Sequence, residues 1–196
     1  MLREHGLTNV DKFIQGVDLN LFRPIPRGRG ERFIVYSGGK LEHRKGQDIL
    51  VAAFREFVKT HPDAVLATPW HNPWQESIMG ITLGGHVANV PRIDDAGNCD
   101  IMRWIAENGV PEKNIHDYGM VSNHLMPEVF AQADVAVFPN RCEGGTNLVA
   151  MEAMASGVPC ILSANTGHLD LIEDDNCYPI TTVSYTHLTL PTNREV

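Results

Sequence analysis

The chain has 196 residues, of which 43% are hydrophobic, and a formal net charge of -8. A chain of this length and composition forms one well-buried globular domain. The acidic balance argues against a broad nucleic-acid surface, and no apolar run approaches the roughly 20 residues that a membrane helix needs.

Cysteine and histidine spacing limits the cofactors that we expect. The four cysteines form no Cys-x-x-Cys pair, which indicates reduced thiols rather than a disulfide framework or a zinc site. The nine histidines include no His-Glu-x-x-His motif, and the polar opening lacks the apolar core of a signal peptide. We therefore expect no metal, no cofactor and a cytoplasmic location, with peripheral membrane attachment of the full-length protein left open.

Along the chain, segments with a strand's composition alternate with segments that have a helical period. Residues 26–30 are rich in Pro, Gly and Arg, which indicates a linker. Beyond it, we predict strands at residues 33–37, 65–69, 114–119, 134–138 and 160–163. We predict helices at residues 47–60, 101–108, 126–133 and 148–155. Residues 70–100 show no clean period. The alternation predicts an α/β fold with a parallel sheet and helices on both faces.

Two polar loops follow predicted strands, and open α/β sheets bind ligands beside such loops. The first loop carries Gly39, Lys40 and Lys45. Two ammonium groups bounded by glycines can neutralise a nucleotide diphosphate without a metal ion. A solvated basic turn before a helix is the alternative interpretation.

The second loop contains Glu143, Gly144 and Gly145, and Glu152 follows inside the next helix. The glycines let a backbone approach a ligand closely, and the free N–H groups at the start of the helix suit an anionic or hydroxyl-rich ligand. A sugar nucleotide has both properties. These residues therefore indicate a site for such a ligand.

A second interpretation of the same loop is purely structural. Thr146 or Asn147 can cap the helix, whose predicted apolar face is Leu148, Met151 and Ala155. The loop would then only reverse the chain, and the glutamate inside the helix would face solvent. Composition and spacing leave both interpretations open.

Residues 139–159 resemble the donor-site signature of the GT-B glycosyltransferases of group 1 (family 4), which has the form Glu-Gly-x-Gly-Leu-x-x-x-Glu-Ala-Met-Ala-x-Gly-x-Pro. The Gly-Val-Asp at residues 16–18 resembles the family's interdomain crossing, and the loop around Lys45 resembles its basic donor loop. The resemblance covers residues 13–178. It implies the Rossmann-like, C-terminal half of a GT-B fold.

The resemblance also implies roles for individual residues. Lys40 and Lys45 would hold the donor phosphates and act as catalytic groups with Glu143, which lies near the donor sugar, while Glu152 would bond the ribose. Further contacts to sugar and phosphate are implied for Gly39, Gly144, Gly145, Thr146 and Asn147. Eight residues separate the two glutamates where the family has seven, and we place the extra residue in the loop at 144–146.

The implied activity is transfer of a sugar from a nucleoside diphosphate-sugar to an acceptor glycan, lipid or protein, with retention of anomeric configuration. Residues 1–30 would then be the interdomain strand and linker from a missing N-terminal domain, and 31–182 an incomplete donor-binding domain. Residues 183–196 resemble a translated sequencing adapter. We expect this fragment alone to be inactive. A non-catalytic nucleotide- or sugar-binding module and a GT-B nucleotide-sugar epimerase are the alternatives.

Overall fold

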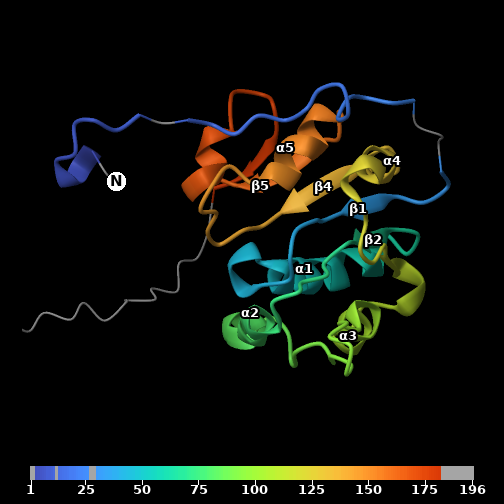
Figure 1. Ribbon diagram of the computed structural model, residues 1–196. Helices are drawn as coiled ribbons and strands as arrows, with labels where there is room; N and C mark the ends of the chain where they lie inside the picture. The colour runs from blue at the N-terminus through green and yellow to red at the C-terminus, as the bar shows by residue number, and fades with distance from the viewer. Residues whose placement is uncertain (1–2, 12, 27–29, 182–196) are drawn as a thin grey trace, which may run out of the picture.

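The centre of the computed structural model is a six-stranded, all-parallel sheet in the order β3-β2-β1-β4-β5-β6 (Figure 1). The structure describes residues 3–11, 13–26 and 30–181. The strands are β1 (Ile34–Tyr36), β2 (Val65–Thr68), β3 (Ile115–Asp117), β4 (Val135–Phe138), β5 (Cys160–Ser163) and β6 (Tyr178–Ile180). This architecture confirms the predicted Rossmann-like α/β fold.

Helices connect the strands. The α-helices are α1 (Gln47–Thr60), α2 (Gln75–Ile78), α3 (Ile101–Glu107), α4 (Met126–Phe130) and α5 (Leu148–Ala155). Short 3-10 helices occupy Arg3–His5, His43–Lys45, Met79–Gly84, Glu112–Asn114, Asn123–Leu125 and Thr166–Asp170. No helix in the described part of the chain is long and apolar enough to cross a bilayer.

The strand order places two loops side by side. The chain runs outward from β1 through β2 to β3, then returns to pair β4 with the other edge of β1, where Tyr36 lies opposite Ala136. The loops after β1 and β4 therefore leave neighbouring carboxyl ends and turn toward opposite faces. A doubly wound sheet has its ligand crevice at this reversal of strand order.

Hydrophobic side chains form one core on each face of the sheet, because successive residues of a strand point to opposite faces. In β4, Val135 and Val137 pack into the core under α1 and α3, whereas Ala136 and Phe138 belong to the core under α4 and α5. Figure 1 shows the two helical layers on either side of the strands. Both faces are thus covered, as predicted.

The segment before β1 belongs to the second core. Phe22 is buried and its ring lies 6.1 Å from that of Phe130 in α4. The described residues of 3–26 contain no strand, in contrast to the interdomain strand expected there. The tail expected at residues 183–196 lies outside the described residues.

The predicted apolar face of α5 is wrong. Leu148 is 37% exposed, and the residues of α5 that are buried are Ala150, Glu152 and Ala153. Small alanines let this helix approach the sheet closely, so the buried side of the helix is not the side with the largest apolar residues. Glu152 consequently lies inside the protein rather than in solvent.

A substitution at Gly46 can test how closely the loops after β1 and β4 approach each other. A methyl group on Gly46 would lie 2.1 Å from the Pro139 carbonyl oxygen, and its φ is +71°. Gly85 has nearly the same φ, +70°, with open space around it. Both Gly→Ala substitutions incur the left-handed penalty of roughly 1–2 kcal/mol, so urea unfolding of Gly46→Ala should show a clearly larger loss than that of Gly85→Ala. Equal losses would contradict the close approach.

Candidate functional site

A buried ion pair joins the loops after β1 and β4. Arg141, in the second loop, donates through both terminal nitrogens to Asp48 in the first turn of α1, at 2.7 Å to each carboxylate oxygen. Asp48 is fully buried. The Arg141 and Cys142 N–H groups also donate to the Arg44 carbonyl, at 2.8 and 3.2 Å. These bonds fix the relative position of the two loops.

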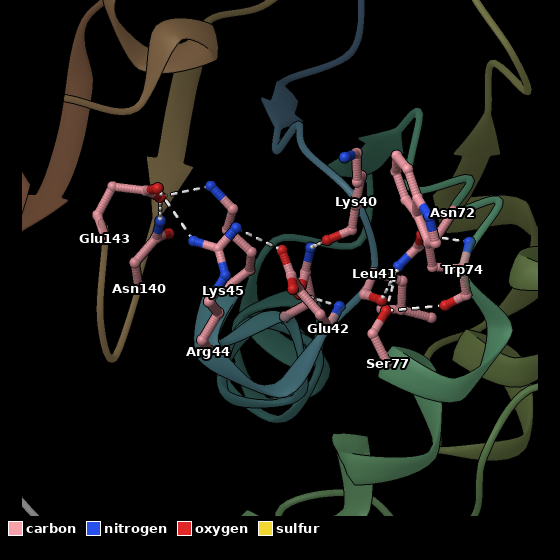
Figure 2. Close-up of polar contacts among 11 residues, drawn as sticks. Lys40, Leu41, Glu42, Arg44, Lys45, Asn72, Trp74, Ser77, Asn140 and Glu143 are labelled. Atoms are coloured by element: carbon pink, nitrogen blue, oxygen red, sulfur yellow. Dashed lines mark hydrogen bonds and ion pairs between the residues drawn. The ribbon is translucent and has the colours of Figure 1, made fainter. Parts of the chain in front are cut away.

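Glu143 follows Arg141 in the same loop, and its carboxylate accepts hydrogen bonds from three side chains (Figure 2). Arg44 donates to one carboxylate oxygen at 3.0 Å, and Asn140 donates to the other at 2.7 Å, together with Lys45. Burial alone raises the pKa of Glu143, but the hydrogen bonds and charges of Lys45 and Arg44 outweigh it and hold the pKa below 4.5. Glu143 is therefore ionised at neutral pH.

The turn after β5 holds the backbone of the Glu143 loop. The Glu143 N–H donates to the Thr166 hydroxyl at 2.8 Å, and the Gly167 N–H donates to the Glu143 carbonyl at 3.1 Å. A methyl group on Gly167 would lie 1.5 Å from the Gly145 carbonyl oxygen, so only glycine fits there. The observed hydrogen bonds of this turn are therefore with the Glu143 loop.

Glu152 is in the opposite situation. Glu152 is 6% exposed as a whole residue, and its carboxylate makes no hydrogen bond or ion pair with the described residues. Burial raises its pKa from 4.5 to about 7. The carboxylate lines a cavity of about 240 Å³ together with Tyr36, Gly39, Lys40 and His71. The Tyr36 hydroxyl is also buried and has no partner among the described residues.

The two predicted lysines do not lie together. Lys45 contacts Glu143, whereas the Lys40 ammonium lies 3.7 Å from the centre of the Trp74 ring (Figure 2). Trp74 is 56% exposed and follows Asn72, whose side chain accepts from the Trp74 N–H at 2.9 Å and donates to the Leu41 carbonyl at 2.9 Å. No pattern in the sequence predicts this contact, because residues 70–100 show no period.

The remaining predicted donor residues line the two loops. Gly39 has a φ of +99° that favours glycine and borders the cavity. Gly144 and Gly145 are exposed with open space around them, and Thr146 is half-buried. Asn147 stands at the N-cap of α5 but does not cap it: with a φ of +57°, its side chain instead lies 2.9 Å from His168 Nε2.

Residues 31–184 match the family model for glycosyl transferases group 1. The chain belongs to this family. A GDP-mannose-dependent alpha-(1-6)-phosphatidylinositol monomannoside mannosyltransferase of Mycolicibacterium smegmatis is 28% identical over an aligned length of 174 residues, which covers 81% of this chain and 39% of that protein. A D-inositol 3-phosphate glycosyltransferase of Segniliparus rotundus is also 28% identical, over 85% of this chain and 34% of that protein. The chain thus spans less than half the length of these group 1 relatives.

Solved structures share the fold. The C-terminal domain of a group 1 glycosyl transferase from Francisella tularensis superposes with a TM-score of 0.60 at 20% identity, covering 84% of this chain and 80% of that domain. An Anabaena protein, HepE, solved with UDP, gives a TM-score of 0.64 at 19% identity over 92% of this chain and 46% of that one. The group 1 family and the GT-B type of α/β domain are therefore confirmed, while the roles of single residues stay predictions.

The Asp48–Arg141 pair should make a large contribution to stability. Asp48→Ala leaves a largely buried guanidinium without its partner, which costs about 3–5 kcal/mol. Urea unfolding should show this loss. Lys59→Ala, which removes an exposed ion pair with Glu56 on the same helix, is the matched control and should unfold like the wild type. A small loss in Asp48→Ala would show that the pair does not hold the loops.

Glu152 should make stability depend on pH. Its folded-state pKa of about 7 exceeds the unfolded value of 4.5, so the unfolded chain loses the proton first and wild-type stability falls as pH rises between these values. Glu152→Gln removes this penalty. It should stabilise the protein by about 3 kcal/mol at pH 8 and by much less at pH 5, as measured by urea unfolding at the two pH values. An equal difference at both would contradict the raised pKa.

Proposed function

We propose that this chain is the donor-binding half of a retaining glycosyltransferase, which transfers a sugar from a nucleoside diphosphate-sugar to an acceptor. The observation that carries the proposal is the buried carboxylate of Glu152, without a partner, in a cavity at the point where the strand order of a group 1 fold reverses. A buried acceptor without a partner costs stability. Ribose hydroxyls would supply the missing donors.

The basic residues of the loop after β1 support the proposal that a diphosphate binds beside this ribose site. Lys45 and Arg44 are held by Glu143, and Arg44 is also paired with Glu42. Together with Lys40, the three cations and two carboxylates of this cluster carry a net charge of +1. Such preorganised cations stabilise the negative charge that develops on a departing diphosphate. We propose that Lys45 and Lys40 act on the phosphates and that Glu143 acts near the donor sugar. Cations of this kind provide the charge without a metal ion, and no cofactor is part of the proposal.

Transfer of a sugar also requires a site for the acceptor. The curated relatives are more than twice as long, and catalysis of transfer requires donor and acceptor to be held together. We propose that a further domain binds the acceptor, and that residues 31–182 alone bind the donor without turning it over. The free thiols among the described cysteines favour a cytoplasmic location.

Calorimetric titration of the 196-residue chain with GDP, UDP and pyrophosphate tests the donor site. Glu152→Gln should lower the affinity for whichever nucleotide binds by about 10-fold, because a charge-assisted bond to ribose is lost. The affinity for pyrophosphate should not change. Lys45→Ala should lower the affinity for both the nucleotide and pyrophosphate, whereas Lys59→Ala should change neither affinity. Because Glu152→Gln is expected to stabilise the free protein, weaker binding cannot be ascribed to unfolding. No binding of either nucleotide to the wild type would overturn the proposal.

A further inference from the structure

The turn after β2 brings a histidine to the cavity of Glu152. β2 ends at Thr68, which pairs with Asp117, the last residue of β3. His71 follows β2 by three residues, lines the cavity, and its Nε2 lies 3.0 Å from Asp117 Oδ2. Both side chains are mostly buried, with 18% and 14% of their surface exposed. The pair therefore occupies a defined position at the β2–β3 side of the cavity.

Asp117 fixes which nitrogen of His71 carries the proton. Its second oxygen, Oδ1, accepts from the Gly119 N–H at 2.9 Å. Both oxygens of the carboxylate are thus acceptors, so a neutral His71 must present Nε2–H to Asp117. Nδ1 is then the nitrogen with the lone pair. It makes no hydrogen bond to the described residues and is free to accept one from a ligand.

We propose that His71 determines specificity in the donor site, where its Nδ1 accepts a hydrogen bond from an O–H or N–H group of the donor's nucleoside. Asp117 is the positioning residue that fixes the tautomer. This inference rests on the proposed function. Glu152 and His71 give the cavity two acceptors, which match the hydroxyls of a ribose and the N–H groups of a base. A pyrophosphate, which has neither a ribose nor a base, gains nothing from them.

Two substitutions distinguish the roles of the two imidazole nitrogens of His71. In His71→Gln, the terminal amide reaches the position of Nε2 and keeps a donor for Asp117, while the acceptor at Nδ1 is lost. In Asp117→Asn, the amide oxygen must stay with the Gly119 N–H, so the NH₂ group faces Nε2. This donor forces the proton of His71 onto Nδ1 and turns the free acceptor into a donor. Neither change alters the volume of the cavity much.

The test uses the whole chain at pH 8, titrated with GDP, UDP and pyrophosphate. Both substitutions should lower the affinity for the nucleotide by about 10-fold, the loss expected when a hydrogen-bonding partner is left unsatisfied. The affinity for pyrophosphate should not change. His116→Gln, an exposed histidine on β3, is the matched control and should bind as the wild type does. Comparing ribonucleotides with 2′-deoxynucleotides, and GDP with IDP, distinguishes a hydroxyl from a base N–H as the group that His71 contacts.

Nitrogen NMR of the imidazoles provides the readout that a merely structural role would not change. The His71 signals, assigned by their loss in His71→Gln, should report the Nε2–H tautomer in the wild type and the Nδ1–H tautomer in Asp117→Asn. Unchanged nucleotide affinity in both variants, with the expected losses in Glu152→Gln and Lys45→Ala, would overturn the role of His71 and leave the donor site intact. An Nδ1–H tautomer in the wild type would overturn it as well.

Discussion

The buried pair between Asp48 and Arg141 is the constraint on which the site depends. It ties the first turn of α1 to the loop after β4 with two parallel hydrogen bonds, a geometry that resists both sliding and rotation. Arg44 and Lys45 precede that turn of α1, and Glu143 follows Arg141 by two residues. Their contacts across the crevice therefore follow from a pair whose aspartate is fully buried and whose arginine is mostly buried. Gly46 and Gly167 complete the arrangement, because only residues without side chains fit between these loops.

Glu143 and Glu152 show how different surroundings shift the pKa of the same kind of group in opposite directions. Glu143 is saturated by donors and cations, which keeps its pKa low, whereas Glu152 has none and its pKa rises to about 7. In the folded protein alone, an unpaired buried carboxylate only costs stability. A position that costs stability without an internal partner is characteristic of a site that meets its partner in a ligand. The contrast therefore supports a binding role for Glu152 more strongly than its place in the signature does.

Much of the fold was predictable because its strands and α1 have strong local patterns. The residues chosen for α1 and for the strand at 160–163 agree with the structure at both ends. β6 was missed, since its three residues carry no pattern of their own and pair only through β5. The face of α5 was wrong because its burial is decided by contact with the sheet and not by hydrophobicity. His71 and Trp74 lie in a segment without a period, so only the fold brings His71 to the cavity and Trp74 to Lys40.

The loop between the glutamates shows why helix and loop positions differ in what the sequence can predict. The residues that follow Asn147 form α5 without interruption. Gly144 and Gly145, where we placed the extra residue, are exposed, and a side chain on either would meet open space. An added residue can bulge outward there, while Glu143 remains held by its three donors and by the turn after β5. The buried contacts on either side therefore survive the change in spacing.

The two lysines of the β1 loop differ in how firmly they are held, and this difference matters for the proposed chemistry. Lys45 is mostly buried and fixed by Glu143, so its charge is in place before a ligand arrives. Lys40 is held by the face of a half-exposed Trp74 ring, an interaction of about 0.5–1 kcal/mol. A diphosphate next to Lys40 offers a charge-assisted hydrogen bond of about 1.5–3 kcal/mol. We therefore expect a diphosphate bound as proposed to draw Lys40 off the ring. The proposed site would thus combine one preorganised cation, which needs no rearrangement during reaction, with a second cation that the substrate itself recruits.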